Sequence, residues 1–328
     1  MKRLAAMVLL AGALVLASRG AMAWTSDGHR AVGFIAEQLI DGSAAQRQVA
    51  ALLLPGENLA RAAIWADCVK ATFCGPHTAE MDAWLAANPR HNEYHYTNVP
   101  FQLEHYREHA VGTDDDDIVQ ILRQCIAVLR QKEGEAANPH HFTPRQALLL
   151  LVHLVGDIHQ PLHVAGTYVN RDGAFMLPQT QSQIDGRTIF DARGGSSLLL
   201  DPSMVDSPTG SRSFHAYWDH TVPDYAMRRS GAKSPQQFAQ IVIAANPAVP
   251  ADAGDAAGWP LLWADDTLAV SHLAMAGVTA GTLTQDGKYR AWPLSLPADY
   301  PVTSSALART QLIKGGYRLA ALLKAIWP

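Results

Sequence analysis

The sequence has few cysteines: Cys68, Cys74 and Cys125 are the three among its 328 residues. So small a number excludes the framework of several disulfides that holds small secreted domains together. One pair can still form in an oxidising compartment, and the short spacing between Cys68 and Cys74 makes them the local candidates. We therefore expect at most one disulfide bond.

Positive charge is also scarce. Lysine and arginine together number 26 against 30 aspartates and glutamates, which gives a formal net charge of −4 at pH 7. No basic field steers phosphates towards such a chain, so its composition does not by itself indicate a nucleic-acid binder. A flexible histidine-rich tract, which would be typical of a zinc carrier, is absent as well.

No stretch after the N-terminus is apolar over the length of a membrane span without charges. The start of the chain has a different pattern: Lys2 and Arg3 precede an apolar stretch over residues 5–17, and residues 21–23 read small-x-small, as at a signal cleavage site. We predict that residues 1–23 are a signal peptide and that the mature protein is periplasmic or secreted. An uncleaved anchor is the alternative.

The most informative stretch is TPRQALLLLVHLVGDIHQPLH, residues 143–163. A threonine cap followed by proline begins a helix, and the run that follows is apolar on nearly every face, as in the middle of a core. His153 and Asp157 interrupt it four residues apart, so they share one face of the helix. Burying them is costly without a partner, and a metal ion is the strongest such partner. A hydrogen-bonded core pair is the alternative.

The remaining pattern is that of a helical protein. Residues 166–200 form a long region rich in Gly, Gln, Asp and Ser, with a turn signal at Asp185-Gly186, and are expected to be irregular or to include a hairpin. The aspartates at 114–117 are interpreted as a solvated helix start, because they lack the ligand spacing of a calcium loop. The sequence predicts one all-α domain over residues 24–328. Its helical patterns lie at 31–40, 44–54, 59–70, 78–87, 113–132, 211–225, 234–245, 252–276 and 303–327.

Histidine and carboxylate recur at the spacing that metal ligands need. His215 and Asp219 repeat the four-residue separation, and His163 follows closely behind the first pair. Ligands of this kind without cysteine suit zinc in a catalytic site. Two further segments fit this pattern: Trp-Ala-Asp at 65–67 and His-Tyr-Thr-Asn at 95–98. Cleavage before Trp-Thr-Ser-Asp-Gly-His would also free an α-amine, with a pKa near ~8, that can bind zinc.

Together these segments resemble the secreted trinuclear-zinc nucleases of the S-one/P-one type, which cleave single-stranded nucleic acids and remove 3′-phosphates. The resemblance covers essentially the whole mature chain, and residues 153–163 are its most specific part. It implies an all-α fold of the zinc phospholipase C and single-strand nuclease type, with one long irregular loop or hairpin insertion. The matching pieces are Trp24, GH at 28–29, WAD at 65–67, HYTN at 95–98, HLVGDIHQPLH at 153–163, RGG at 193–195 and HAYWD at 215–219, with looser matches at 263–266 and 316–323.

The resemblance implies three zinc ions as cofactors. Such ions would make the site locally positive although the protein is acidic. The first ion would be bound by Asp67, His95, His153 and Asp157, the second by His163, His215 and Asp219, and the third by the Trp24 amine and carbonyl with His29 and Asp157. Asp157 would thus bridge the first and third ions.

The resemblance also assigns roles around the ions. Asp67 would orient or deprotonate the attacking water, Lys70 would contact the phosphate, Tyr96 would stack on a base and Asn98 would bond its edge. Stacking works best on unpaired bases, which favours single strands. The products would be 5′-nucleotides.

Several of these assignments have alternatives. Ser196 stands where the family usually has asparagine after the GG pair, which leaves one phosphate or nucleophile contact in doubt. Ordinary packing is the alternative for Tyr96, and a solvated surface position is the alternative for Lys70. For a second base, Tyr168 and Phe175 are the candidates in the long loop, although packing there is the simpler interpretation.

The predicted substrates are single-stranded DNA and RNA and nucleotides, with no membrane span after signal removal and no obligate protein partner. Two rival functions share parts of the pattern. A zinc phospholipase C would share the helical scaffold, the N-terminal tryptophan and the three ions, but His-Tyr-Thr-Asn favours nucleotides. A non-catalytic periplasmic zinc carrier would bind the metal without hydrolysing any phosphodiester.

A mature chain that retains one extra residue before Trp24 is expected to lose most of its binding at the third zinc site, because a peptide nitrogen cannot replace a free amine as a ligand. Zinc content per chain, measured by mass spectrometry after gel filtration, checks this. An unchanged zinc content with full activity would exclude N-terminal ligation.

Overall fold

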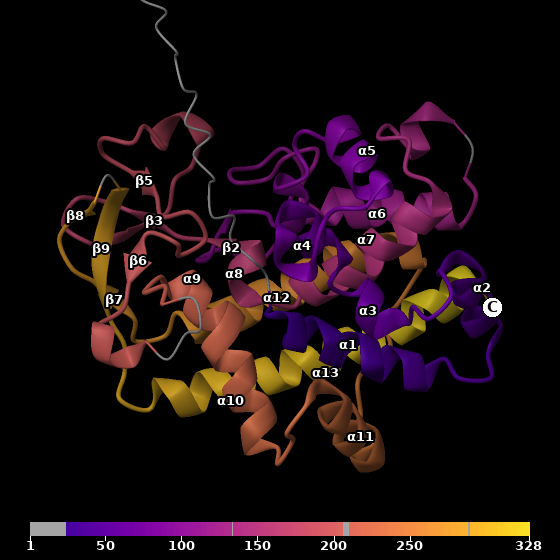
Figure 1. The fold of residues 1–328 in the computed structure, drawn as a ribbon. Coiled ribbons are helices and arrows are strands. Elements are labelled where there is room, and N and C mark those ends of the chain that lie inside the picture. Colours follow the sequence, from indigo (N-terminus) through magenta and orange to yellow (C-terminus); the bar gives the residue numbers. More distant parts are fainter. Residues whose placement is uncertain (1–23, 133, 206–209, 288) are drawn as a thin grey trace, which may run out of the picture.

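The computed structural model describes residues 24–132, 134–205, 210–287 and 289–328. The predicted signal peptide, residues 1–23, lies outside the described residues. Within the described residues, no helix is both long and apolar enough to cross a membrane. The all-α prediction is confirmed: helices form most of the body, and the strands are short and gathered at one side (Figure 1).

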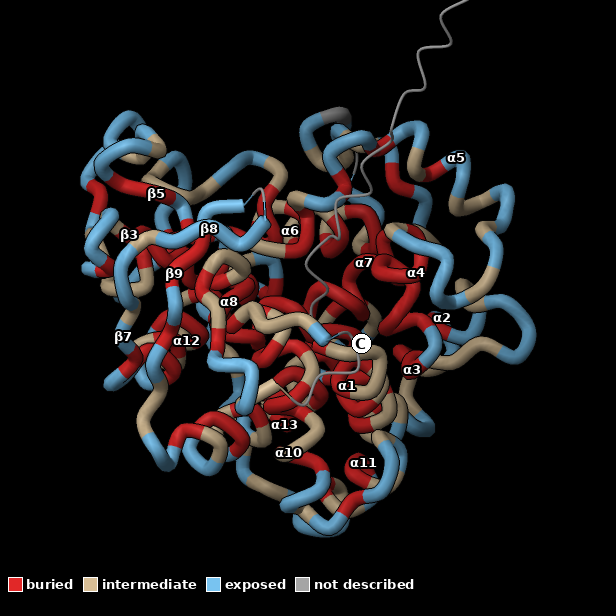
Figure 2. Tube along the Cα trace, turned by 60° about the vertical axis from the view of Figure 1, so that its left-hand side comes forward, coloured by how far each residue is buried: buried red, intermediate tan, exposed pale blue. Residues whose placement is uncertain are grey.

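Helix α7 (Pro144–Asp157) is the centre of the core. Thr143 caps it in a reciprocal capping box with Gln146, and every residue from Ala147 to Asp157 is buried (Figure 2). Helix α6 (Ile118–Leu129) packs along one side of α7, and α13 (Tyr300–Ile326) also lies against it. The apolar run of α7 is therefore packed inside the core, as its sequence predicted.

The N-terminal helix α1 (Ser26–Leu39) lies along the C-terminal helix α13 (Figure 1). Other helices complete the body around this pair and α7. Their bounds are α2 (Ala44–Leu52), α3 (Leu59–Ala62), α4 (Trp65–Lys70), α5 (Ala79–Ala87), α8 (Pro161–Val164), α9 (Phe214–Ala216), α10 (Val222–Arg229), α11 (Pro235–Ala245) and α12 (Trp259–Ala274).

Several predicted helix boundaries were wrong; within residues 252–276, for example, the α-helix α12 begins only at Trp259, after a 3-10 turn at Ala256–Gly258. Residues 59–70 do not form one continuous helix: it is interrupted by a turn that begins at Ala63, between α3 and α4. The Ala63 carbonyl oxygen accepts a hydrogen bond from His153 Nδ1 (2.7 Å).

The aspartates at 114–117 precede α6 and are not part of its first turn. Asp117 is the cap, and its side chain accepts from the backbone N–H groups of Val119 and Gln120.

The long region 166–200 contains β3 (Tyr168–Val169), β4 (Phe175–Met176) and β5 (Phe190–Asp191), which pair antiparallel in the order β4-β3-β5. The expected hairpin is present there. A second sheet, which the sequence analysis did not predict, pairs β6 (Leu198–Leu199), β7 (Thr279–Ala280) and β8 (Thr284–Asp286) with β9 (Tyr289–Ser295). In addition, β1 (Val99–Pro100) and β2 (Ala165–Gly166) form a short parallel pair beside α8.

The predicted disulfide is confirmed: Cys68 and Cys74 are bonded, and Cys125 is a buried free thiol. The bond joins the end of α4 to the turn that follows it. Asp67 and Lys70, two of the predicted site residues, are therefore in or beside a covalently closed segment.

Gly316 permits the close packing of α13 on α1. A Cβ at this position would lie 2.5 Å from Cβ of Ile35, so Gly316→Ala is expected to destabilise the fold by about 1–3 kcal/mol through overpacking. Urea unfolding measures the change. Gly258→Ala, where a Cβ would meet nothing within 4 Å, is the matched control and should change stability by less than about 0.5 kcal/mol. Equal effects of the two substitutions would contradict the packing argument.

Candidate metal centre

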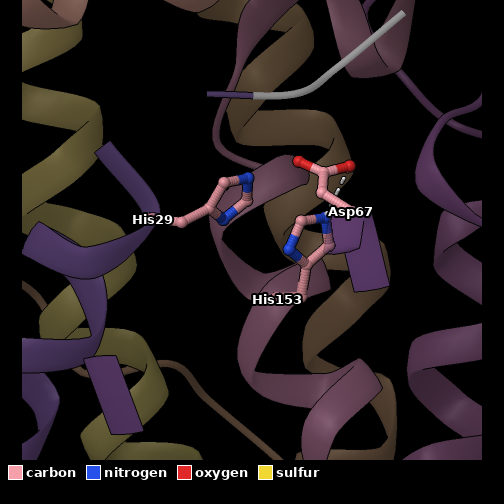
Figure 3. A group of neighbouring side chains, drawn as sticks. All are labelled: His29, Asp67 and His153. Carbon is pink, nitrogen blue, oxygen red and sulfur yellow. Dashed lines mark ion pairs between the residues drawn. The ribbon is translucent and has the colours of Figure 1, made fainter. Parts of the chain in front are cut away.

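Buried histidines and aspartates from distant parts of the chain meet at the C-terminal half of α7. Figure 3 shows His29 of α1, Asp67 of α4 and His153 of α7 with their polar atoms turned towards one another. His95, Asp157, His163, His215 and Asp219 are also at most 4 % exposed. Three groups have ligand atoms close enough to hold an ion: His29 with Asp67 and His153; His95 with His153 and Asp157; and His163 with His215 and Asp219.

Asp157 presents its two carboxylate oxygens to different histidines. Oδ1 lies 3.1 Å from Nε2 of His29, whereas Oδ2 lies 2.9 Å from Nδ1 of His95 and 3.1 Å from Nε2 of His153. One carboxylate therefore lies between the His29 ring from α1 on one side and two rings on the other, His95 from the 3-10 turn η2 (Glu93–His95) and His153 from α7. This is the arrangement expected of a bridging ligand.

Asp67 faces the same histidines from α4. Its Oδ1 lies 3.8 Å from His153 Nε2 and 3.1 Å from the Lys70 ammonium, whose side chain is only 8 % exposed. Burial alone would raise the pKa of Asp67, but Lys70 and the neighbouring histidines hold that pKa at about 2. Asp67 is thus ionised at neutral pH, and Lys70 is not a solvated surface lysine.

The second group lies on α8, α9 and the π-helical turn Tyr217–Thr221 that follows α9. His215 Nε2 is 3.3 Å from Oδ2 of Asp219, and His163 Nε2 is 3.8 Å from its Oδ1. Gln160 donates a hydrogen bond to that Oδ1 at 2.8 Å. A π-turn inside a helix is frequent at functional sites, and here it contains the Asp219 ligand candidate.

Backbone carbonyl oxygens fix the orientation of three rings. Nδ1 of His153 donates to Ala63, Nδ1 of His163 to His95, and Nδ1 of His215 to Gly194, each at 2.7 Å. Since a carbonyl oxygen only accepts, Nδ1 carries a hydrogen in each ring, and in the neutral form of the ring Nε2 presents a lone pair to the site. Metal-binding histidines are commonly oriented in this way.

The site contains polar atoms that are buried without a hydrogen-bond partner. They are Nδ1 and Nε2 of His29, the Nε2 atoms of His95, His163 and His215, and Oδ1 of Asp157. Leaving such atoms unsatisfied costs about 1–3 kcal/mol each. Metal cations would satisfy these imidazole and carboxylate lone pairs together, so the residues present fit a zinc-type centre.

The protonation states of most of the histidines suit metal binding. Burial first, and then nearby positive charge, lowers the pKa of His95 and of His215 to about 3. Burial also lowers the pKa of His29 and of His163. For His153, burial acts in the same direction, but the Asp157 and Asp67 carboxylates outweigh it and raise the pKa. Most of the rings are therefore neutral at pH 7 and have lone pairs available to bind a cation.

The N-terminal segment is seated against this site. Trp24 is fully buried, its indole Nε1 donates to the Gly156 carbonyl oxygen at 2.9 Å, and the Thr25 N–H donates to the Asp219 carbonyl oxygen at 2.7 Å. Trp24 and Thr25 are thus hydrogen-bonded to the backbone beside Asp157 and at Asp219, two of the ligand candidates.

The predicted substrate residues lie nearby in the chain but are less buried. Tyr96 and Asn98 are half-buried on either side of Thr97, whose N–H donates to the carbonyl oxygen of His163. Ser196 is half-buried at the end of a turn in which Arg193, Gly194 and Gly195 all have positive φ.

Sequence reasoning missed Gln160, which bonds Asp219, and the carbonyls of Ala63 and Gly194. It also missed Gly156, where a Cβ would lie 2.6 Å from Nδ1 of His29. A glycine beside Asp157 in a strongly helical run was the available signal, because glycine weakens a helix unless close packing requires it.

Comparison with known proteins gives a consistent match. A family model described as S1/P1 Nuclease matches residues 24–328. Endonuclease 5 of Arabidopsis thaliana is 23% identical over 329 residues, which cover 94% of this chain and 92% of that protein. From the same plant, Endonuclease 1 is 28% identical over 49% of this chain and 50% of its own length. Endonuclease 4 is 30% identical over 44% of this chain and 46% of its own length. The chain thus spans about half the length of the last two relatives.

Gly156→Ala is expected to displace the His29 ring and to lower the affinity for divalent metal ions, measured with zinc as the probe, about tenfold or more, because a Cβ 2.6 Å from Nδ1 cannot be accommodated without movement. Competition with a chromophoric chelator measures the affinity. Gly258→Ala serves as the control glycine substitution. An unaltered zinc affinity in a folded Gly156→Ala protein would show that the His29 position does not matter for the metal.

Proposed function

Because the chain belongs to the S1/P1 nuclease family, we propose that it is a zinc-dependent endonuclease that hydrolyses single-stranded RNA and DNA to 5′-phosphorylated products and also removes 3′-phosphates from nucleotides. Family membership makes the protein a nuclease, a hydrolase of phosphodiester bonds in nucleic acids. The position of Asp157 is the observation that carries the finer proposal, since its two oxygens face histidines of two different groups.

Three zinc ions would be held by the residues that the sequence analysis proposed. The first would have Asp67, His95, His153 and Asp157, the second His163, His215 and Asp219, and the third Trp24, His29 and Asp157. The ligand atoms of His29 also lie close to those of Asp67 and His153, so the residues proposed for the first and third ions adjoin one another. When bound, zinc supplies Lewis-acid activation of water and stabilises negative charge that develops on phosphate oxygens.

The chain's own residues contribute to phosphate binding and water positioning. With a pKa held at about 2, Asp67 remains a hydrogen-bond acceptor at neutral pH and can orient an attacking water, but it is a weak base. Lys70 is held beside it by the 3.1 Å ion pair and can share its ammonium with a phosphate oxygen. Three divalent ions would more than neutralise the carboxylates of Asp67, Asp157 and Asp219, so the acidic composition of the chain does not exclude phosphate binding at this site.

The half-buried pair Tyr96 and Asn98 supports single-strand specificity. Burial raises the pKa of the Tyr96 phenol, so the ring stays neutral and can stack on a base. Stacking requires a base that is free of its partner strand, and each stacked base is worth about 1–3 kcal/mol. Asn98 would bond the edge of that base, and Ser196 would provide a hydroxyl where the family usually has an amide.

We also propose that residues 24–328 act as one nuclease domain and that the mature protein is periplasmic or secreted. Its proposed partners are its nucleic-acid and nucleotide substrates, without an obligate protein subunit.

Asp157→Asn is expected to empty two of the three zinc sites, because Asp157 belongs to the proposed ligand sets of both the first and the third ion. The cleavage rate of single-stranded DNA and RNA should fall at least about 10³-fold. Zinc per chain and release of acid-soluble 5′-nucleotides are the two measurements. Asp117→Asn is the matched control: this buried aspartate caps α6, and asparagine caps a helix about equally well.

Three outcomes would count against the proposal. Unchanged zinc content in Asp157→Asn would exclude its bridging role. Release of phosphocholine from phosphatidylcholine without any nucleotide release by the natural sequence would favour the phospholipase alternative. Tight zinc binding without any phosphodiesterase activity would favour a carrier.

A further inference from the structure

The stretch that leads from α7 into α8, residues 158–161, connects the two parts of the metal centre. Asp157 precedes this joining turn, as we call it, at the end of α7, and His163 follows it on α8. From within the joining turn, Gln160 donates a hydrogen bond from Nε2 to Oδ1 of Asp219 at 2.8 Å. The path of the joining turn therefore contributes to where His163 and Asp219 lie relative to Asp157.

The joining turn leaves backbone carbonyl oxygens without the partners that a continuing helix would give them. Pro161 has no N–H group, and the next two N–H groups of the chain both donate to Gln160, one to its side chain and one to its carbonyl oxygen. The carbonyl oxygens of Ile158 and His159 therefore need partners from elsewhere. Since both residues are fully buried, leaving these oxygens unsatisfied would be costly.

Helices α12 and α13 supply these partners. Helix α12 packs against α8, and α13 packs against α7. The Thr267 hydroxyl donates to the Ile158 carbonyl oxygen at 2.7 Å, and the side-chain amide of Gln311 donates to the His159 carbonyl oxygen at 3.0 Å. The same amide nitrogen lies 3.4 Å from the Thr267 hydroxyl oxygen, so the two side chains are bonded to each other as well.

Ser271 lies one helical turn after Thr267 on the same face of α12. Its hydroxyl oxygen is 2.9 Å from the Pro161 carbonyl oxygen and 2.8 Å from the Thr267 carbonyl oxygen, and its one hydrogen can go to either. The Pro161 oxygen also accepts from the Ala165 N–H. Ser271 therefore adds to a carbonyl that is already bonded, whereas Thr267 bonds one that the turn leaves open.

Thr267, Ser271 and Gln311, which we call the polar clamp, are fully buried. Burying hydroxyl and amide groups among apolar side chains is costly unless they are hydrogen-bonded. The bonds that the polar clamp donates within the described residues all end on the joining turn or on Thr267 itself. The polar groups of these two helices are therefore directed at the stretch between the ligand candidates.

The side chain of His159 is held from the same direction. Its Nδ1 donates to the Val155 carbonyl oxygen at 2.7 Å, and its Nε2 accepts from the Arg318 guanidinium of α13 at 3.1 Å. His159 belongs to none of the three ligand groups found in the described part of the chain. This histidine of the joining turn thus binds the scaffold, on which the turn is fastened by backbone and side chain alike.

We propose that the polar clamp positions the metal ligands: by binding the carbonyl oxygens of the joining turn, it fixes the placement of His163 relative to Asp157. This inference rests on the proposed metal-dependent nuclease function. A constellation of ligands has to be held within about 0.5 Å of its working geometry by the groups behind it, and the backbone of a short turn does not ensure this by itself.

The loss of the polar clamp is expected to affect one part of the centre more than the other. Helix α7 itself holds Asp157, because that residue lies on the helix before the turn begins. His163 depends on the joining turn for its position, and Asp219 is bonded by Gln160 of that turn. We therefore expect weaker binding by the group of His163, His215 and Asp219, and little change around Asp157.

The test dialyses zinc-loaded protein against chelator buffers of decreasing free Zn²⁺, the probe ion, and measures zinc per chain. Thr267→Val keeps the shape of the side chain and removes the hydrogen bond. It should move the midpoint of one ion about tenfold to higher free zinc and the other midpoints less than about twofold. Thr267→Ser keeps the hydroxyl and loses a methyl group, and should bind zinc like the natural sequence.

A second variant and a control act on the same helix. Gln311→Met keeps the length of the side chain without its amide and should shift the same midpoint as Thr267→Val. Ser305→Ala is the matched control for a lost buried hydroxyl, because Ser305 is 2 % exposed on α13 and donates to the Val302 carbonyl oxygen at 2.9 Å. Its zinc midpoints should change less than about twofold.

Several results would overturn the positioning role. Unchanged midpoints in folded Thr267→Val and Gln311→Met would do so, as would equal shifts in Thr267→Val and Thr267→Ser, which would point to methyl packing. A shift of all midpoints together would also do so, because a loss of fold stability weakens every site that exists only in the native state. Zinc binding as expected, without cleavage of any phosphodiester by the natural sequence, would overturn the nuclease proposal alone.

Discussion

The burial of a carboxylate and its histidines inside the most apolar helix is the constraint on which the structure depends. Asp157 and His153 are completely buried in a helix whose other buried residues are leucine, valine, alanine and one glycine. Ionised groups lose several kcal/mol of hydration in such surroundings, and good geometry with opposite charge must offset that loss. The surrounding segments supply further rings and carboxylates at ligand distance, which is the arrangement that a cluster of cations stabilises.

Backbone carbonyl oxygens fix the orientation of three histidine rings in this cluster. The break between α3 and α4, the turn at His95 and the turn at Gly194 each present a carbonyl oxygen to one histidine. Irregular backbone in these places would be a defect in a purely structural helix bundle. Here it fixes the ring orientations, and so links the local folding of each segment to the chemistry of the site.

The sequence predicted much of this arrangement because the evidence was local. Four-residue spacing places His153 with Asp157, and caps such as Thr143 mark helix starts. Non-local features were not predictable: the break at Ala63 accepts a hydrogen bond from a ring 90 residues away, and in the sheet formed by β6 to β9 three of the four strands are only two or three residues long, too short to show a period. Gln160 and Gly156 gave weak signals, since their roles appear only when another segment packs against them. The joining of separate His and Asp segments into three groups was inferred from the family resemblance, not from spacing.

The bond between Cys68 and Cys74 closes a small ring that includes Lys70. A helix as short as α4, Trp65–Lys70, is marginal by itself, because few backbone bonds stabilise its nucleus. The covalent closure limits fraying of its last turn and keeps the ammonium beside Asp67. Under reducing conditions that tether would be lost and the last turn would be free to open. The redox state of the surroundings thereby becomes linked to how firmly Lys70 is held beside Asp67.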